Sequence, residues 1–132
     1  MSKPNPQERY YSRDHEWVIY YNDGTALIGI TDYAQEMLTD IVFVDLPEMG
    51  RKVVQHATVA VVESVKSVSD IFAPVSGEVI AVNERLEETP ELINQDAFGD
   101  GWIVKMTLSN PDELKMLLTA ADYEEMLKEE KN

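Results

Sequence analysis

The sequence contains no cysteine, and this absence excludes several kinds of chemistry at once. A chain without cysteine has no disulfide framework, no thiolate metal site and no cysteine nucleophile. Any redox chemistry must therefore come from a bound group. The two histidines, His15 and His56, also lack a His or Cys companion at zinc-ligand spacing, and the acidic residues do not follow a calcium-loop pattern. We therefore expect no metal site.

Basic residues and long apolar runs are also scarce. There are 11 lysines and arginines against 25 acidic residues, which gives a net charge of -14. This charge disfavours nucleic acid and anionic membrane surfaces as partners and favours basic faces of other proteins. The apolar run Val59–Val62 is interrupted by Glu63, far short of the roughly 20 residues that span a bilayer. We expect no membrane segment.

The length and the first residues set the expected organisation and location. A chain of 132 residues is long enough for one domain with one core. The first nine residues are polar, without the apolar stretch of a secretion signal or the arginine-rich pattern of a transit peptide. We therefore expect a single domain over residues 1–132 and a cytoplasmic protein.

Short strands separated by turn residues dominate the pattern. The strands Glu16–Tyr21 and Thr25–Ile30 flank Asn22-Asp23-Gly24, a sequence typical of a tight hairpin turn. Alternation in Trp102–Leu108 predicts that Trp102, Val104, Met106 and Leu108 face the core. The other predicted strands are Ile41–Leu46, Val53–Val54, Thr58–Val62, Val68–Phe72 and Glu78–Val82. This spacing favours a sandwich or a barrel.

Helices are expected in two places only. Thr31 or Asp32 caps a short helix that ends near Asp40 and has Tyr33, Ala34, Met37 and Leu38 on its apolar face. At the C-terminus, Asn110 caps a helix that begins with Pro111, and Thr119 caps a second one. The residues between them, Glu84–Asp100, are interpreted as a long polar connection.

No residue stands in a recognisable catalytic motif. The chain has no Gly-x-Ser-x-Gly sequence, and neither histidine lies in a triad motif. His15 precedes Glu16 at the start of a strand, where we expect an edge hydrogen bond rather than acid–base catalysis. Gly99-Asp100-Gly101 is a turn, because no lysine or strand-to-helix context follows it.

Lys66 is the most informative residue. It lies at the predicted tip of a hairpin, where the turn presents one amine to solvent and to a modifying enzyme. An exposed turn lysine often serves only solubility. A Schiff-base role would need a desolvated lysine, and a hairpin tip provides the opposite environment. The pattern therefore favours modification of Lys66 over catalysis by it.

Glu63-Ser64-Val65-Lys66, with Pro74 and Gly77 further on, closely resembles the lipoate-attachment hairpin of the glycine cleavage system H protein family. Val65 and Ser67 stand where biotin carriers have methionines, and Val65 also argues against the lipoyl domains of 2-oxo acid dehydrogenases. Further segments resemble the same family and extend the match over about residues 10–127: Asp14–Val18, Gly29–Gln35, Asp40–Pro47, Glu91–Asn94 and Gly99–Ile103.

The resemblance implies a mainly β, barrel-sandwich hybrid fold with a short helix in the N-terminal third and short C-terminal helices. It implies a carrier, not an enzyme, in which lipoate on Lys66 accepts an aminomethyl group from a pyridoxal-phosphate glycine decarboxylase (P protein). A tetrahydrofolate-dependent aminomethyltransferase (T protein) then removes it, and dihydrolipoyl dehydrogenase (L protein) reoxidises the dithiol. A lipoate-attaching enzyme is a fourth partner. The cofactor would supply the chemistry, and the protein its position and protection.

The resemblance also implies residues that hold the amine of the loaded arm, namely Glu16, Asp70 and, less directly, Asp14. Two departures from the family pattern are His56, where many relatives have glycine, and Ser67, where alanine is common. His56 puts the backbone angles of its turn in question. Two alternatives stay open: a lipoate-relay protein that donates lipoyl groups to dehydrogenase complexes, and an unmodified β-domain binding module.

Overall fold

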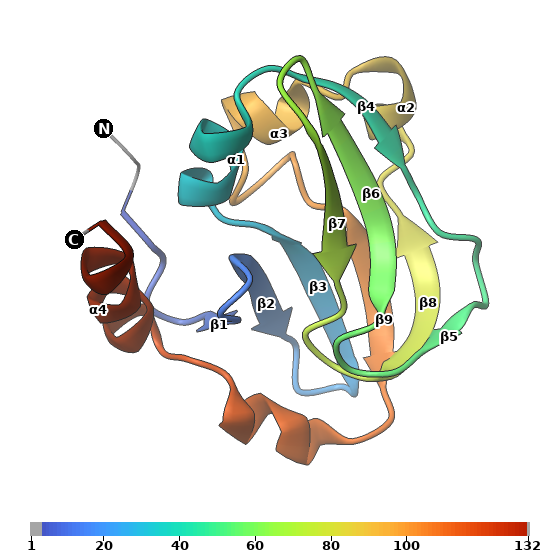
Figure 1. Cartoon of the computed structure of the whole chain (residues 1–132). Coiled ribbons are helices and arrows are strands. Elements are labelled where there is room, and N and C mark those ends of the chain that lie inside the picture. Colours follow the sequence, from blue (N-terminus) through green and yellow to red (C-terminus); the bar gives the residue numbers. More distant parts are fainter. Residues whose placement is uncertain (1–3, 132) are drawn as a thin grey trace.

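The computed structural model describes residues 4–131, and the strands form two antiparallel sheets that face each other (Figure 1). The larger sheet has the order β1-β2-β3-β9-β8-β5: Tyr10–Tyr11, Glu16–Tyr20, Thr25–Ile30, Val104–Leu108, Gly77–Val82 and Lys52–Val53. The smaller sheet has the order β4-β6-β7: Ile41–Asp45, Thr58–Ser64 and Val68–Phe72. The mainly β sandwich is confirmed, although the strands described here form two sheets rather than one closed barrel.

The turn between β2 and β3 has the chemistry that the sequence predicted. Asn22 and Gly24 have φ angles of 64° and 88°, in the left-handed region that tight hairpin turns need. The Asp23 carboxylate accepts a hydrogen bond from the Thr25 backbone N–H at 3.0 Å. The two strands then pair from Tyr20 opposite Ala26 to Glu16 opposite Ile30. This register places Glu16 opposite Ile30, the last residue of β3.

The strand β9 begins later than predicted. It starts at Val104, and Trp102 is only partly buried, so the expectation that Trp102 belongs to the main core face is wrong. Trp102 instead packs against a second cluster of side chains. The prediction is confirmed for Val104 and Met106, which are fully buried. Gly77 of β8 lies so close to β9 that a Cβ there would be 1.6 Å from the Thr107 carbonyl oxygen.

The helix α1, Asp32–Leu38, is capped by Thr31, whose side chain accepts a hydrogen bond from the Ala34 N–H at 3.2 Å. Thr39 ends the helix with a φ angle of 65°. Ala34 and Leu38 pack against the core as predicted, whereas Met37 is 54% exposed. The expectation that Met37 belongs to a buried face is therefore wrong, because the helix ends at the edge of the sandwich.

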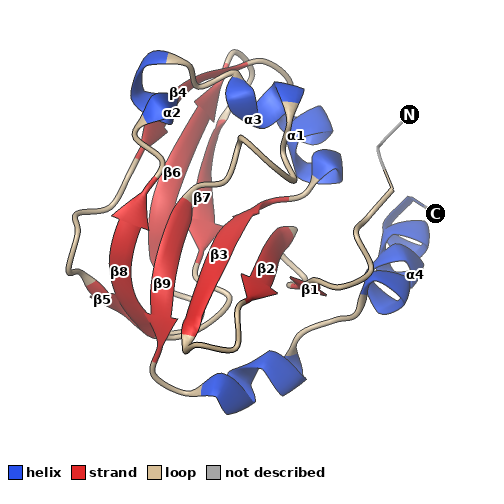
Figure 2. Ribbon diagram, turned by 180° about the vertical axis from the view of Figure 1, so that it is seen from behind, coloured by secondary structure: helices blue, strands red, loops and turns tan. Residues whose placement is uncertain are grey.

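The segment Glu84–Asp100 is not the plain polar connection that was expected. It contains two one-turn helices, α2 (Arg85–Glu88) and α3 (Leu92–Gln95). Three of its apolar side chains, Leu86, Leu92 and Ile93, belong to the main core. The segment thus covers one end of the sandwich, on the side where α1 also lies (Figure 2).

The C-terminal part contains a 3-10 helix, η1 (Pro111–Met116), and α4 (Ala120–Lys131). Asn110 caps η1 by accepting a hydrogen bond from the Asp112 N–H at 3.3 Å, and Thr119 accepts one from the Asp122 N–H at 3.1 Å. Both predicted caps are confirmed. The helix α4 lies beside β1, so it returns to the N-terminal part of the chain (Figures 1 and 2).

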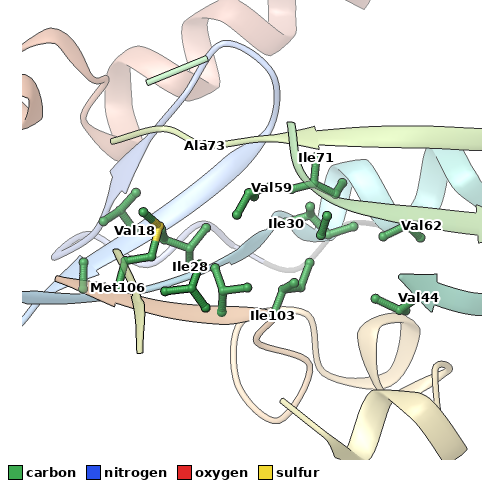
Figure 3. Packing of buried hydrophobic residues seen from close by; sticks show 14 of the residues in the cluster. Val18, Ile28, Ile30, Val44, Val59, Val62, Ile71, Ala73, Ile103 and Met106 are labelled. Atoms are coloured by element: carbon green, nitrogen blue, oxygen red, sulfur yellow. The ribbon is translucent and has the colours of Figure 1, made fainter. Parts of the chain in front are cut away.

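Two clusters of buried apolar side chains stabilise these layers. The main cluster lies between the sheets, with Ile28 and Met106 on one side and Val62 and Ile71 on the other (Figure 3). The second cluster joins the larger sheet to α4 and contains Tyr11, Trp17, Ala120, Tyr123 and Met126. No helix in the described part of the chain is long and apolar enough to cross a membrane.

Candidate functional site

Lys66 lies in the turn between β6 and β7. This turn lies at the end of the molecule where α1 is found (Figure 1). The turn is held by Ser64, whose hydroxyl accepts hydrogen bonds from the N–H groups of Lys66 and Ser67 at 3.1 and 3.0 Å. The Ser64 N–H donates to the Ser67 carbonyl at 2.8 Å. A fixed backbone therefore presents an exposed lysine, as the sequence predicted.

This turn also contacts the segment that contains α1. The Lys66 ammonium donates a hydrogen bond to the Met37 carbonyl at 3.1 Å, and the Val65 N–H donates to the Asp40 carbonyl at 2.9 Å. The side chains of Val65 and Met37 are both largely exposed. The lysine therefore contacts the last turn of α1, and the exposed apolar side chains of Val65 and Met37 belong to the same region.

A cavity of about 270 Å³ adjoins the same helix, and we call it the lysine-side cavity. Tyr33, Met37 and Leu38 of α1 give it an apolar wall, while Asp14, Asp70 and Glu130 bring carboxylates from three other parts of the chain. Met37 thus both lines this cavity and accepts the hydrogen bond from Lys66. A long apolar group attached to Lys66 would find a matching wall there, with anionic groups suited to a cationic end.

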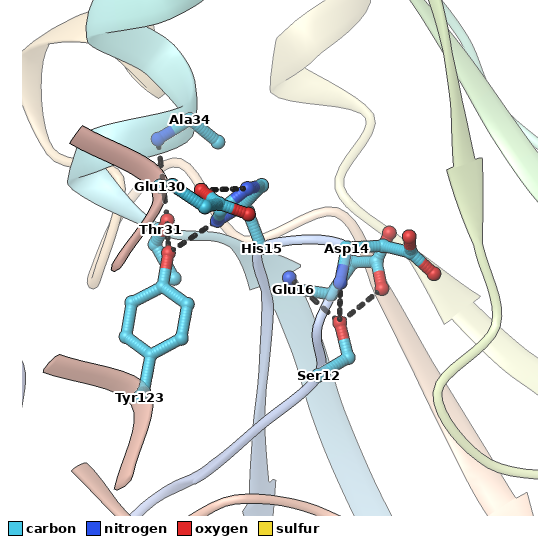
Figure 4. Close-up of polar contacts among 8 residues, drawn as sticks. All are labelled: Ser12, Asp14, His15, Glu16, Thr31, Ala34, Tyr123 and Glu130. Carbon is cyan, nitrogen blue, oxygen red and sulfur yellow. Dashed lines mark hydrogen bonds and ion pairs between the residues drawn. The ribbon is translucent and has the colours of Figure 1, made fainter. Parts of the chain in front are cut away.

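Glu16 lies in a different environment from Asp70. Its side chain is 1% exposed, and its carboxylate accepts a hydrogen bond from the Ser12 hydroxyl at 2.5 Å (Figure 4). It also accepts one from the Phe72 N–H at 3.1 Å. Burial raises the pKa of Glu16 to about 7, although these two hydrogen bonds oppose the shift. The Glu16 carboxyl can therefore exchange a proton near neutral pH.

Glu16 lines a second cavity of about 180 Å³, which we call the inner cavity. Its walls include Ser12, His56, Pro74 and Leu117, and Asp14 lines both cavities. Of the three acids implied by the family resemblance, Asp14 and Asp70 share the lysine-side cavity, whereas Glu16 lies in the neighbouring one.

His56 adopts a φ angle of 77°, so the turn before β6 keeps a left-handed conformation although the residue is not glycine. Its N–H donates to the Ala73 carbonyl at 2.8 Å, and the Ala73 N–H donates to the Ala57 carbonyl at 2.7 Å. These two bonds fix the turn against the segment that follows β7. The imidazole lines the inner cavity.

His15 contacts the C-terminal helix rather than a strand edge. Its Nδ1 lies 2.8 Å from the Tyr123 hydroxyl, and its Nε2 lies 3.4 Å from a Glu130 carboxylate oxygen (Figure 4). Burial lowers the pKa of His15, while the nearby Glu130 and Asp14 oppose that shift. The prediction of a hydrogen-bonding role is confirmed, but its expected location at a strand edge is wrong.

Sequence reasoning missed several residues of the lysine-side cavity, namely His15, Tyr33, Met37, Ser69 and Glu130. The helical spacing of Tyr33 and Met37 signalled an apolar face but not that it would border a cavity. Glu130 is more than a hundred positions from Asp14, and no pattern in the sequence links the two. Among the described residues, no cluster of three or more His, Cys, Asp or Glu side chains is arranged to hold a metal ion.

Comparison with known proteins gives a consistent result. The sequence model of the family Glycine cleavage H-protein matches residues 9–130. The glycine cleavage system H protein of Thermus thermophilus is 52% identical over 125 residues, which are 95% of this chain and 97% of that protein. That of Salmonella arizonae is 53% identical with the same coverage.

A solved structure agrees with these sequences. The crystal structure of a glycine cleavage system H protein from Mycobacterium marinum superimposes with a TM-score of 0.86 at 38% sequence identity. The match covers 94% of this chain and 99% of that one. The two chains therefore share the sandwich over nearly their whole length.

Proposed function

The chain belongs to the glycine cleavage H-protein family, and from this membership we propose that Lys66 is the residue that carries its lipoyl group. Proteins of this family are lipoyl carriers of the glycine cleavage system, and so is this one. Their lipoate is attached to a lysine, and Lys66 occupies the turn expected for it. The lipoate-relay alternative is not favoured, because the relatives above are named for glycine cleavage.

One observation supports Lys66 most directly. Its Nζ contacts the Met37 carbonyl at 3.1 Å, and Met37 lines the cavity that contains Asp14 and Asp70. The attachment point and a cavity with apolar and anionic walls are therefore adjacent. When bound, the lipoyl group supplies a disulfide that accepts an aminomethyl group and must be reoxidised after the group is removed. The chain itself positions this group and limits its access to water.

We propose that carboxylates of the two cavities hold the protonated amine of the load. Asp70 and Asp14 would meet it in the lysine-side cavity, where both side chains are exposed enough to accept a cation. Glu16 would act from the inner cavity, which Asp14 also lines. A protonated amine near Glu16 would favour the ionised form of that carboxyl.

The partners follow from the family. They are the P, T and L proteins of the glycine cleavage system, namely glycine decarboxylase, aminomethyltransferase and dihydrolipoyl dehydrogenase. We add a lipoate-attaching enzyme that recognises the turn around Lys66. We also propose that the chain is a carrier without catalytic activity of its own. A cytoplasmic location stays a prediction from the sequence.

We further propose that residues 1–132 form one lipoyl-carrier domain. The strand order supports this organisation, because β9 pairs with both β3 and β8 and so joins distant parts of the chain in one sheet. The second cluster supports it as well, since it packs α4 against residues of β1 and β2. Neither end of the described chain forms a layer of its own.

The attachment site is tested by incubating the protein with lipoate ligase, ATP and lipoate and measuring its intact mass. We expect wild type to gain one lipoyl increment and Lys66→Arg to gain none, because arginine keeps the charge but offers no acylable amine. Lys115→Arg is the matched control, since Lys115 is also an exposed lysine, at 83% exposure. A gain on Lys66→Arg would contradict the assignment, and an unmodified wild type would favour the binding-module alternative.

A further inference from the structure

A chain of hydrogen bonds connects the C-terminal helix to the helix that lines the lysine-side cavity (Figure 4). The Tyr123 hydroxyl, on α4, lies 2.7 Å from Thr31 Oγ1 and 2.8 Å from His15 Nδ1. Thr31 Oγ1 in turn accepts the hydrogen bond from the Ala34 N–H that caps α1. One buried hydroxyl therefore contacts His15, which lines the cavity, and Thr31, which caps the helix that lines it.

Both contacts of Tyr123 reach residues at which the backbone is under constraint. His15 has a φ angle of 71°, a conformation that non-glycine residues keep only when their surroundings hold them. Thr31 is fully buried, and its N–H donates to the His15 carbonyl at 3.0 Å. The conformation before β2 and the start of α1 are therefore fixed together, and the Tyr123 hydroxyl is bonded to both.

The cavity depends on these same residues. His15 lines it directly, and α1 contributes Tyr33, Ala34, Met37 and Leu38 to its wall. The helix α4 also contributes Glu130, whose carboxylate lies 3.4 Å from His15 Nε2. A change in the start of α1 would move the apolar wall of the cavity and the Met37 carbonyl that Lys66 contacts.

We propose that Tyr123 is a positioning residue for the lysine-side cavity: through its hydroxyl it holds α1 and His15 in the arrangement that shelters a loaded arm. This inference rests on the proposed carrier function of Lys66. Tyr123 is not among the residues that line the cavity, so it acts through Thr31 and His15. The C-terminal helix is then part of the carrier site and not only a cover for the second cluster.

The chain offers a closely matched control. Tyr11 is also fully buried, and its ring stacks on that of Tyr123 with centroids 5.0 Å apart. Its hydroxyl, however, donates to the Pro6 carbonyl at 2.6 Å, away from α1. Tyr123→Phe and Tyr11→Phe each remove one buried hydroxyl from the same cluster and keep the stacked rings. Only the first removes a contact to Thr31 and His15.

The first test measures amide hydrogen exchange in the unmodified protein. In Tyr123→Phe we expect the Ala34 and Gln35 amides, which donate to the Thr31 side chain and carbonyl, to exchange about two- to tenfold faster than in wild type. Amides of β6 in the main core should be unchanged. Tyr11→Phe should leave α1 exchange at the wild-type rate. Equal exchange of α1 in wild type and in Tyr123→Phe would overturn the proposal.

The second test uses lipoylated protein loaded by glycine decarboxylase with glycine. Water releases the load as formaldehyde and ammonia and leaves the dithiol, and the ammonia is followed without aminomethyltransferase. We expect Tyr123→Phe to release it about two- to tenfold faster than wild type and Tyr11→Phe to match wild type. If wild type is never loaded, the proposed function fails. If wild type and Tyr123→Phe retain the load equally, only the role of Tyr123 fails.

Discussion

The lysine-side cavity and the inner cavity both contain carboxylates, but they use them differently. Asp70 of the lysine-side cavity is exposed on the edge strand β7. Glu16 of the inner cavity is 1% exposed and already bonded to Ser12 and to the Phe72 N–H. An exposed acid can accept a new cation without losing existing partners, whereas the buried acid is part of the packing between the sheets. Two acids assigned one role from sequence thus lie in unlike environments.

The largest expected effect tests which acid meets the amine. Asp70→Asn keeps the shape of the side chain and removes its charge, so a charge-assisted hydrogen bond of about 1.5–3 kcal/mol is lost. We expect the loaded carrier to release ammonia to water about tenfold faster than wild type or more. The measurement is the release rate without aminomethyltransferase. Lipoylation of the variant should match wild type.

Glu16→Gln is the counterpart of that variant in the inner cavity. Because Glu16 keeps its bonds to Ser12 and Phe72, we expect its replacement to raise the release rate less than Asp70→Asn does. A larger effect at Glu16 would place the amine in the inner cavity. If both variants release ammonia at the wild-type rate, neither acid holds the load.

The next effect concerns the proton on Glu16. Its pKa is raised by burial to about 7 in the folded protein, above the ordinary value of 4.5 that holds when the chain is unfolded. The folded state therefore binds the proton more tightly, so Glu16 contributes most to stability below about pH 4.5, and this contribution is lost as the pH rises to about 7. Only wild type loses this contribution as the pH rises. The free energy of unfolding of Glu16→Gln minus that of wild type should therefore be about 2 kcal/mol larger at pH 8 than at pH 5.

Urea unfolding of both proteins at the two pH values measures this difference. Glutamine can still accept from the Phe72 N–H, and any change in its bond to Ser12 is the same at both pH values, so the pH dependence of the difference isolates ionisation. Glu125→Gln, on the exposed face of α4, controls for the loss of one negative charge. A difference between wild type and Glu16→Gln that stays the same at pH 5 and pH 8 would mean that Glu16 is ionised throughout.

The smallest effect concerns His56, which lines the inner cavity with a φ angle of 77°. Glycine adopts this conformation without a steric penalty, so His56→Gly should raise the free energy of unfolding by about 0.5–1 kcal/mol. Ala57→Gly is the control, because Ala57 is not among the residues with positive φ, and it should lower stability. Thermal unfolding of both variants measures these changes. A loss of stability in His56→Gly would show that the contacts of the imidazole stabilise the protein by more than the positive φ angle destabilises it.

Local chemistry made much of the fold predictable. The turn at Asn22-Asp23-Gly24, the caps at Asn110 and Thr119 and the hairpin around Lys66 each depend on a few neighbouring residues. The two one-turn helices between Glu84 and Asp100 were not predicted, because each is too short to show a periodic pattern and is held by the core contacts of Leu86 and Ile93. Such helices depend on tertiary packing rather than on propensity.

The candidate site also contains some residues that the sequence could predict and others that depend on tertiary packing. Lys66 could be proposed from its own segment, and Asp14 and Asp70 from the family resemblance. Both acids line the cavity next to Met37, whose carbonyl contacts Lys66. Their separation from Glu16 could not be predicted, because it depends on how β2 and β7 face each other across the sandwich. The contribution of Glu130 depends on where α4 packs, which is decided by Tyr123 and its neighbours in the second cluster.

The hydrogen bond from Lys66 to the Met37 carbonyl affects how Lys66 can be acylated and what acylation changes at α1. The last turn of α1 contains no basic residue of its own, so the Lys66 ammonium is the cation at the carbonyl end of this helix. Acylation converts that ammonium into a neutral amide. Lipoylation of Lys66, as proposed above, would therefore require the modifying enzyme first to separate the lysine from the helix, and the lipoylated protein would lack this charge. The unmodified and lipoylated proteins would then differ at α1 even before the arm is loaded.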